Sequence, residues 1–192
     1  MPDIRFLDKT GRGMEELSEV FSPGEISAAV RRLGAEISRD YAGQGILAVC
    51  VLNGSFIFFS DLIRELTVPV EADFLKARSY ESTKSSGELE VDCWLRTDIE
   101  GKDVLVVEDI VDTGLTLNVI IQRLKARNPK TLKVCALLDK RAGRKTEINP
   151  DYTGFLVDDY FLVGYGLDLD GRYRNLRGVC KVQPPGNISD TS

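Results

Sequence analysis

A pair of neighbouring carboxylates and a short hydroxyl-rich loop are the residues of this chain best suited to chemistry. Glu108 and Asp109 follow an apolar run that begins at Val104, and the loop 112–116, Asp-Thr-Gly-Leu-Thr, starts after two further residues. Adjacent carboxylates accept hydrogen bonds from vicinal hydroxyls or hold a hard cation. The pair therefore predicts a site for a diol or for Mg²⁺.

The loop beside this pair has the composition of an anion site. The apolar residues from Leu117 to Leu124 share one helical face, so the loop ends at a helix N-terminus, where unpaired N–H groups and the helix dipole attract a negative charge. Gly114 allows close backbone approach, and the hydroxyls of Thr113 and Thr116 add donors. A phosphate cradle next to a diol or magnesium site would suit a ribose 5-phosphate. The alternative is a structural turn in which Asp112 or Thr113 only caps the helix.

Strands and helices alternate along the chain around these residues. The capping box Ser22-Pro-Gly-Glu25 predicts a helix that continues to about residue 41, and an apolar segment predicts a second helix at 56–66. Apolar and β-branched runs predict strands at 4–7, 46–52, 70–76, 90–95, 104–107 and 130–138.

This alternation predicts an α/β fold with a central parallel sheet, right-handed crossovers and flanking helices. Ligands of such sheets bind at the carboxyl ends of the strands. The Asn53-Gly54 turn and the stretch 108–116 both follow predicted strands, so we expect them to meet in one site.

The composition is that of one ordinary soluble domain covering residues 1–192. Hydrophobic residues make up 43% of the chain and charged residues 29%, which suits a single core of this length. The net charge of −5 and the isoelectric point near 5.0 disfavour a dedicated nucleic-acid binder. No apolar run approaches the length needed to cross a membrane.

The histidine and cysteine content restricts the possible chemistry. The chain has no histidine, which excludes Ser-His-Asp, Cys-His and histidine–metal catalysis and leaves acid–base work to Asp, Glu, Lys or Tyr. Its four cysteines are far apart and form no Cys-x-x-Cys pair. That spacing disfavours a zinc site or a disulfide framework and predicts a reducing, cytoplasmic location.

The stretch 104–116 resembles the phosphoribosyl diphosphate (PRPP) signature of the type I phosphoribosyltransferases, in particular the hypoxanthine-guanine branch, and the resemblance continues to about Cys180. It implies a parallel sheet with a small hood over the purine site, formed by segments at about 1–20 and 155–183. The implied activity is purine salvage, in which 5-phosphoribose passes from PRPP to N9 of hypoxanthine or guanine, giving IMP or GMP and pyrophosphate. It also implies Mg²⁺ as cofactor and a homodimer or homotetramer.

The resemblance implies a role for each residue that matches the family pattern. Asp112 is the catalytic candidate, which would take or hold the proton of purine N7. Pyrophosphate would be bound by Asn53, Gly54 and Arg174. The implied metal ligands are Glu108, Asp109 and Asp168. The implied PRPP and 5-phosphate contacts are Glu108, Asp109, Asp112, Thr113, Gly114, Leu115 and Thr116. The implied purine contacts are Lys140, Phe161, Leu162 and Asp168, with Ser79 and Tyr80 at the start of a mobile lid.

Two positions depart from the family pattern. Asn53 stands where mammalian members carry a lysine, and Leu115 replaces a lysine of some members. Both departures bear on pyrophosphate binding. Two other functions stay open: a non-catalytic regulator that senses PRPP, and a xanthine-preferring transferase. Lys140 disfavours adenine, because a charged lysine only donates hydrogen bonds and would face the 6-amino group.

Overall fold

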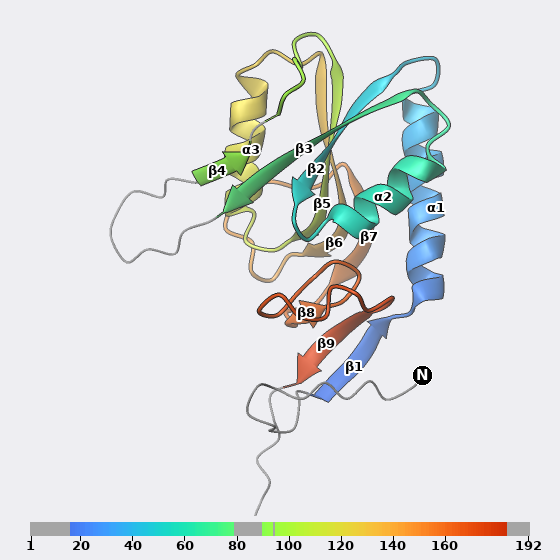
Figure 1. Cartoon of the computed structure of the whole chain (residues 1–192), viewed down its shortest axis with the longest axis vertical. Coiled ribbons are helices and arrows are strands. Elements are labelled where there is room, and N and C mark those ends of the chain that lie inside the picture. The colour runs from blue at the N-terminus through green and yellow to red at the C-terminus, as the bar shows by residue number, and fades with distance from the viewer. Residues whose placement is uncertain (1–15, 79–89, 94, 184–192) are drawn as a thin grey trace, which may run out of the picture.

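A six-stranded sheet forms the centre of the molecule (Figure 1). The computed structural model describes residues 16–78, 90–93 and 95–183. Five of the strands are parallel, and β4 is antiparallel to its neighbour β3. In sheet order the strands are β4 (Glu90–Cys93), β3 (Val70–Arg78), β2 (Ile46–Leu52), β5 (Asp103–Val111), β6 (Thr131–Lys140) and β7 (Tyr152–Val157).

Three helices cover the two faces of this sheet. The helices α1 (Pro23–Asp40) and α2 (Phe56–Glu65) pack on one face, and α3 (Leu115–Lys125) packs on the other. The predicted capping box is confirmed, because the Ser22 hydroxyl accepts from the Glu25 N–H while the Glu25 carboxylate accepts from the Ser22 N–H. The predicted α/β class, with a parallel sheet between helices, is confirmed.

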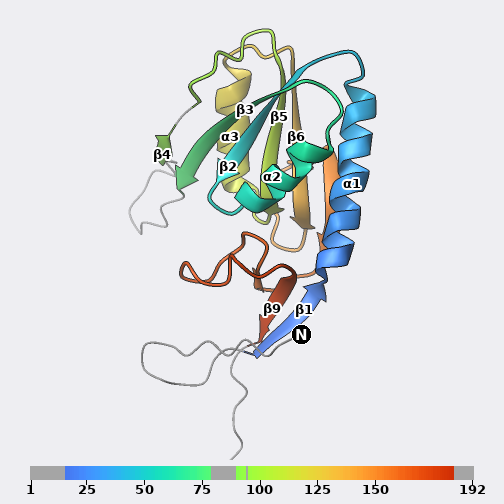
Figure 2. The same cartoon turned by 45° about the vertical axis from the view of Figure 1, so that its right-hand side comes forward.

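A second, three-stranded antiparallel sheet lies beyond the carboxyl ends of the large sheet (Figures 1 and 2). It consists of β1 (Glu16–Phe21), β9 (Val179–Gln183) and β8 (Leu162–Val163). The ring of Phe21 in β1 stacks on Phe155 in β7, with 4.0 Å between the ring centroids. This stack joins the small sheet to the large one.

Several elements differ from the sequence-based expectation. β5 continues through the acidic pair to Val111, because Glu108 and Ile110 still pair with Ala136 and Leu138 of β6. β7 was not predicted; it occupies 152–157, so the chain leaves the large sheet only after Val157. The expected strand at 4–7 and the lid residues Ser79 and Tyr80 lie outside the described residues. Within the described part of the chain, no helix combines the length and apolar character needed to cross a membrane.

Candidate active site

Two neighbouring cavities open at the carboxyl edge of the large sheet. They have volumes of about 390 and 240 Å³ and share the residues Gly54, Ile110 and Asp112. The larger one brings together the predicted site residues Asn53, Gly54, Asp109, Asp112, Lys140, Phe161, Leu162, Asp168 and Arg174. The smaller one contains Glu108, Thr113, Gly114 and Thr116. Leu115 lines neither cavity, and its side chain is turned to solvent.

The loop after β5 leads directly into the first turn of α3. Gly114 occupies the N-cap position with a φ of 76°, a conformation that glycine adopts without strain. No side chain caps this helix; the Thr113 hydroxyl accepts from the Leu115 N–H at 3.4 Å, and the Asp112 carboxylate faces Lys140 instead. The interpretation of Asp112 as a helix cap is therefore wrong, and the helix N-terminus remains available to an anion.

The acidic pair is largely removed from water. Asp109 is only 8% exposed. A Cβ at Gly54 would collide with the Asp109 carboxylate, so the turn that follows β2 lies directly against β5. Burial raises the pKa of Glu108 well above its usual range, and the neighbouring Asp109 charge raises it further. Burial also raises the pKa of Asp109. The carboxylates are thus crowded and poorly solvated, a state that a bound cation or hydroxyl donors would relieve.

On the opposite side of the larger cavity, Lys140 forms two ion pairs. Its Nζ lies 3.0 Å from Asp112 and 2.8 Å from Asp159, and its side chain is only 11% exposed. Burial alone would lower the pKa of Lys140, but its contacts with Asp159 and Asp112 outweigh burial and raise the pKa. Asp159 was not predicted as a site residue, although its position two residues before Phe161 was a usable signal.

β8, the residue before it and the loop after it close the cavity and carry the remaining predicted residues. Phe161 is 55% exposed at the rim, whereas Leu162 is buried. The Asp168 carboxylate accepts a hydrogen bond from Arg174 at 2.6 Å and a second from the Gly171 N–H at 2.7 Å. These contacts fix the side chains of Asp168 and Arg174 relative to each other.

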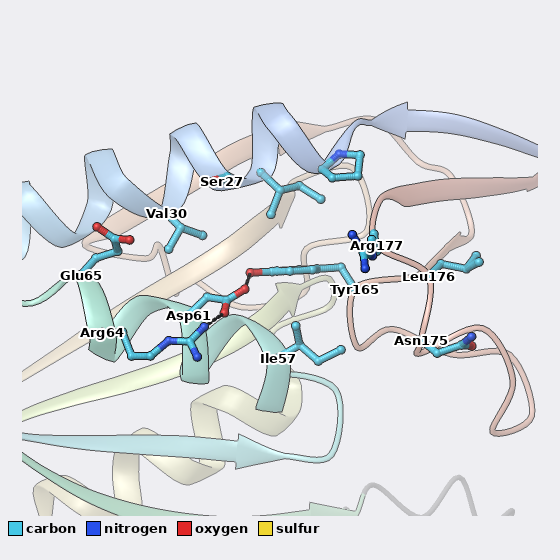
Figure 3. A pocket seen from close by; sticks show the side chains of 12 residues that line it. Ser27, Val30, Ile57, Asp61, Arg64, Glu65, Tyr165, Asn175, Leu176 and Arg177 are labelled. Carbon is cyan, nitrogen blue, oxygen red and sulfur yellow. Dashed lines mark hydrogen bonds and ion pairs between the residues drawn. The ribbon is translucent and has the colours of Figure 1, made fainter. Parts of the chain in front are cut away.

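The same loop is fastened to α2. The Tyr165 hydroxyl donates to Asp61 at 2.6 Å, and Asp61 also pairs with Arg64, as Figure 3 shows. Tyr165, Asp61 and Arg64 line a separate cavity of about 420 Å³ between α1 and α2. Their effect is to hold the segment that precedes Asp168 against the large sheet.

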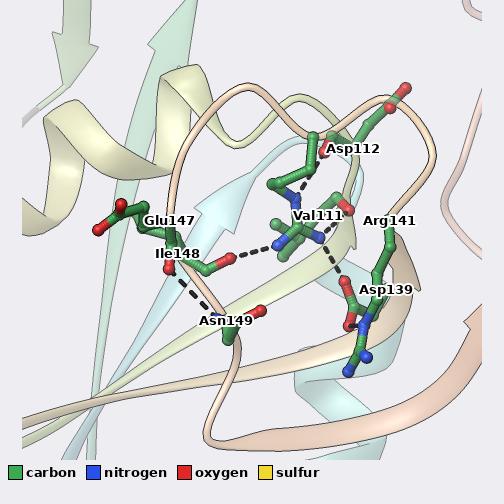
Figure 4. A network of polar contacts seen from close by, with 8 residues as sticks. Val111, Asp112, Asp139, Arg141, Glu147, Ile148 and Asn149 are labelled. Carbon is green, nitrogen blue, oxygen red and sulfur yellow. Dashed lines mark hydrogen bonds and ion pairs between the residues drawn. The ribbon is translucent and has the colours of Figure 1, made fainter.

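A buried ion pair beneath the two cavities was also missed at the sequence level. Asp139 is fully buried at the end of β6 and binds the guanidinium of Arg144, which continues to the backbone of the loop after β5 (Figure 4). The basic stretch 140–145 gave no sign of this pair, because a run of charged residues does not show which arginine side chain points into the protein.

Comparison with known proteins agrees with this geometry. Residues 17–170 match the phosphoribosyl transferase domain family. The hypoxanthine-guanine-xanthine phosphoribosyltransferase of Tritrichomonas foetus is 41% identical over 165 residues, 85% of this chain and 90% of the relative. The hypoxanthine-guanine phosphoribosyltransferase of Bacillus subtilis is 43% identical over 166 residues, 86% of this chain and 92% of the relative.

A solved structure extends the comparison to the fold. The hypoxanthine-guanine phosphoribosyltransferase of Bacillus anthracis superposes with a TM-score of 0.84 at 38% identity, over 88% of this chain and 100% of that chain. Similarity at this level over most of the chain shows the family. The chain belongs to the phosphoribosyltransferase family, in its hypoxanthine-guanine branch.

Proposed function

We infer that this protein is a purine-salvage enzyme, a pentosyltransferase that moves 5-phosphoribose from PRPP to N9 of hypoxanthine or guanine and releases pyrophosphate. The observation that carries this inference is the joining of two cavities at Asp112. The smaller one is built around a helix N-terminus and Glu108, and the larger one around Lys140, with Asp109 in its wall. The first suits a sugar phosphate and the second a 6-oxopurine.

We propose that the smaller cavity binds the ribose 5-phosphate of PRPP. The N–H groups and hydroxyls of 113–116 would hold the phosphate at the start of α3. Glu108 and Asp109 would accept hydrogen bonds from the ribose diol. Gly54 and Arg174 line the adjoining larger cavity, where a cationic guanidinium would stabilise the charge that grows on departing pyrophosphate. Asn53 lines the same cavity and would donate through its amide in place of a lysine.

The pair of Lys140 and Asp112 matches one edge of a 6-oxopurine. The oxygen at C6 accepts a hydrogen bond, and N7–H beside it donates one, so an ammonium and a carboxylate 3.0 Å apart are complementary to both. Asp112 would hold or take the N7 proton while N9 attacks the ribose. Phe161 at the rim would stack on the ring, and Leu162 would present its backbone to the base.

Magnesium fits this site only together with the substrate. Among the residues that the structure describes, no group of three or more Asp, Glu or Cys side chains could hold a metal ion alone. Mg²⁺ commonly binds through one or two carboxylates plus substrate oxygens, so Glu108 and Asp109, and Asp168 on the pyrophosphate side, are the proposed ligands. Bound there, it would supply positive charge to the leaving group.

One assay tests the proposal. The protein is incubated with PRPP and Mg²⁺ and, in turn, hypoxanthine, guanine, xanthine and adenine, while nucleotide formation is followed. We expect product with hypoxanthine or guanine and little with adenine. PRPP binding without turnover of any base would instead support a regulator that senses PRPP.

Xanthine is a second candidate substrate, because the relative from T. foetus carries xanthine in its name. The separate xanthine arm of the assay decides this point, since a xanthine-preferring enzyme would turn over xanthine fastest.

We also propose a cytoplasmic homodimer or homotetramer that binds neither nucleic acid nor membranes. The free thiols of Cys50, Cys135 and Cys180 suit a reducing compartment. Phe56 and Phe74 are 44% and 45% exposed, which is unusual for large aromatic residues and favours coverage by a second subunit. Light scattering coupled to size-exclusion chromatography measures the molecular mass and would return a single 21.3 kDa chain if this part of the proposal is wrong.

A further inference from the structure

Arg144 connects the end of β5 to the end of the neighbouring strand β6. Its guanidinium donates to the backbone carbonyls of Val111 and Asp112, each at 2.9 Å, and to the carbonyl of Ile148. It also pairs with the carboxylate of Asp139 (Figure 4). The side chain of Arg144 is 11% exposed and that of Asp139 is fully buried. The arginine therefore sits inside the protein with four acceptors around it.

Only a guanidinium can satisfy this arrangement. Arginine presents five N–H donors in a rigid plane, whereas lysine has three donors on a single nitrogen. The buried charge is balanced by Asp139, which fixes the plane of the guanidinium relative to β6. Because two of the acceptors are the carbonyls of Val111 and Asp112, the backbone at the end of β5 is held from the β6 side.

The loop that contains Arg144 contacts the loop 112–116, which we call the phosphate loop, at two further points. The Lys145 N–H donates to the Thr113 carbonyl at 2.9 Å. A Cβ at Gly114 would collide with the Thr146 hydroxyl and lie 3.2 Å from the Arg144 side chain. The loop that contains Arg144 is thus packed directly against the backbone of 112–114.

We propose that Arg144, oriented by Asp139, is a positioning residue that sets the backbone of Asp112 and the phosphate loop for transfer. Arg144 acts without touching substrate. This inference rests on the proposed catalytic role of Asp112. Its expected consequence is kinetic: with Arg144 replaced, the chain still folds, but Asp112 and the phosphate N–H groups are misplaced, and a displacement of about 1 Å at such a site costs on the order of 100-fold in rate.

The test compares Arg144→Lys with a matched control, Arg141→Lys. Arg141 also pairs with Asp139, at 3.0 Å, but its side chain is 65% exposed. We expect kcat/KM for PRPP to fall by roughly 10- to 100-fold in Arg144→Lys and to stay within about twofold in Arg141→Lys, because the exposed Arg141 side chain is bonded to no backbone carbonyl of the loop after β5 among the contacts described and lysine keeps its charge. Circular dichroism and thermal unfolding establish that each variant is folded. Should Arg144→Lys not fold, Arg144→Gln takes its place.

A double-mutant cycle with Asp112→Asn separates positioning from mere structural support. If Arg144 acts through Asp112, Arg144→Lys will reduce kcat far less in the Asp112→Asn background than in the wild type, because coupled residues are not additive. In Arg144→Ala, millimolar guanidinium is expected to restore part of kcat.

The outcomes of the cycle distinguish the two proposals. A folded Arg144→Lys variant with wild-type kcat and KM, beside an Asp112→Asn variant that has lost turnover, overturns the positioning role alone. Wild-type turnover in Asp112→Asn would overturn the proposed role of Asp112 itself. Equal losses from Arg144→Lys in both backgrounds would show that Arg144 supports only the fold.

Discussion

At the scale of single residues, the ion pair between Lys140 and Asp112 is the centre of the proposed base site. A lysine that is 11% exposed would normally lose protons more easily, but the two carboxylates beside it raise its pKa, so it remains an ammonium ion. If a bound base displaced the contact of Lys140 with Asp112, the contact with Asp159 would remain. The ammonium can therefore turn to the purine oxygen without being left unpaired.

Replacing Lys140 tests how the base is selected. Lys140→Met keeps the length of the side chain and removes the charged donor, whose hydrogen bond contributes about 1.5–3 kcal/mol. We expect kcat/KM for hypoxanthine to fall roughly 10- to 150-fold, with the preference over adenine reduced. Steady-state kinetics with both bases measures this.

Lys125→Met at the exposed end of α3 serves as the control and is expected to leave both values unchanged. A Lys140→Met variant with unaltered discrimination between hypoxanthine and adenine would remove Lys140 from the base site.

At the scale of elements, the turn after β2 depends on the absence of a side chain at Gly54. A Cβ there would collide with the Asp109 carboxylate, which is buried and cannot move away freely. Gly54→Ala is therefore expected to raise KM for PRPP at least tenfold while the protein stays folded. Initial-rate kinetics at saturating base gives this value.

Gly24→Ala is the matched control for this change. A Cβ at Gly24, in the first turn of α1, would meet its nearest atom at 3.9 Å. We expect unchanged kinetics and a stability equal to the wild type or up to about 1 kcal/mol higher. Equal KM values for the two alanine variants would contradict the close approach of Gly54 to Asp109.

The amino ends of β5 and β6 are joined by Asp103. Its carboxylate accepts from Lys130 at 2.8 Å and from the Thr131 hydroxyl at 2.7 Å. Burial alone would raise the pKa of Asp103, but these contacts outweigh burial and lower it. A carboxylate with a lowered folded-state pKa adds stability above its unfolded pKa of about 3.9, and this stability is lost as the pH falls through the folded value.

Asp103→Asn is accordingly expected to lower the free energy of unfolding by about 1 kcal/mol at pH 7, with the difference shrinking as the pH falls below the unfolded pKa of about 3.9. Urea unfolding of both proteins across this pH range checks the sign. Asp98→Asn, on an exposed turn, is the control. A difference that widens toward acid pH would show that Asp103 is not stabilised as a carboxylate.

The elements differ in how far the sequence determines them. The capping box at Ser22 and the apolar run of β2 are local signals, and both gave the correct element. β5 was predicted too short, because its last residues owe their strand conformation to pairing with β6 rather than to their own apolar character. The inward turn of Arg144 was not predictable, since it depends on the carboxylate of Asp139 in the adjacent strand.

At the scale of the whole molecule, the second sheet joins parts of the chain that are far apart in sequence. Glu16 pairs with Gln183 and Phe21 with Val179. The local sequence of neither strand predicts which strand it pairs with. The family resemblance placed the C-terminal site residues in order, but it gave neither this long-range pairing nor the contact of Tyr165 with Asp61 that holds their loop against α2. Leu162 of β8 pairs with Lys181 of β9, so one wall of the base cavity belongs to the small sheet.

The stack of Phe21 on Phe155 is therefore expected to control the base site more than the PRPP site. Phe155 lies in β7 of the large sheet, and Phe21 lies in β1, which is joined through β9 to β8. In Phe21→Ala the small sheet loses this contact, and we expect the unfolding free energy to fall by about 1–3 kcal/mol, less than for a fully buried phenylalanine. KM for hypoxanthine is expected to rise several-fold while KM for PRPP changes less than twofold.

Leu132→Ala provides a destabilised control whose lesion lies near the amino end of β6, away from both cavities. It is expected to lower the thermal midpoint without changing either KM, because the carboxyl edge of the sheet keeps its geometry. If Phe21→Ala and Leu132→Ala shift stability alike and neither alters KM for the base, the small sheet does not set the base site. A selective rise in KM for the base in Phe21→Ala would mean that the two sheets must be held together for the purine to bind.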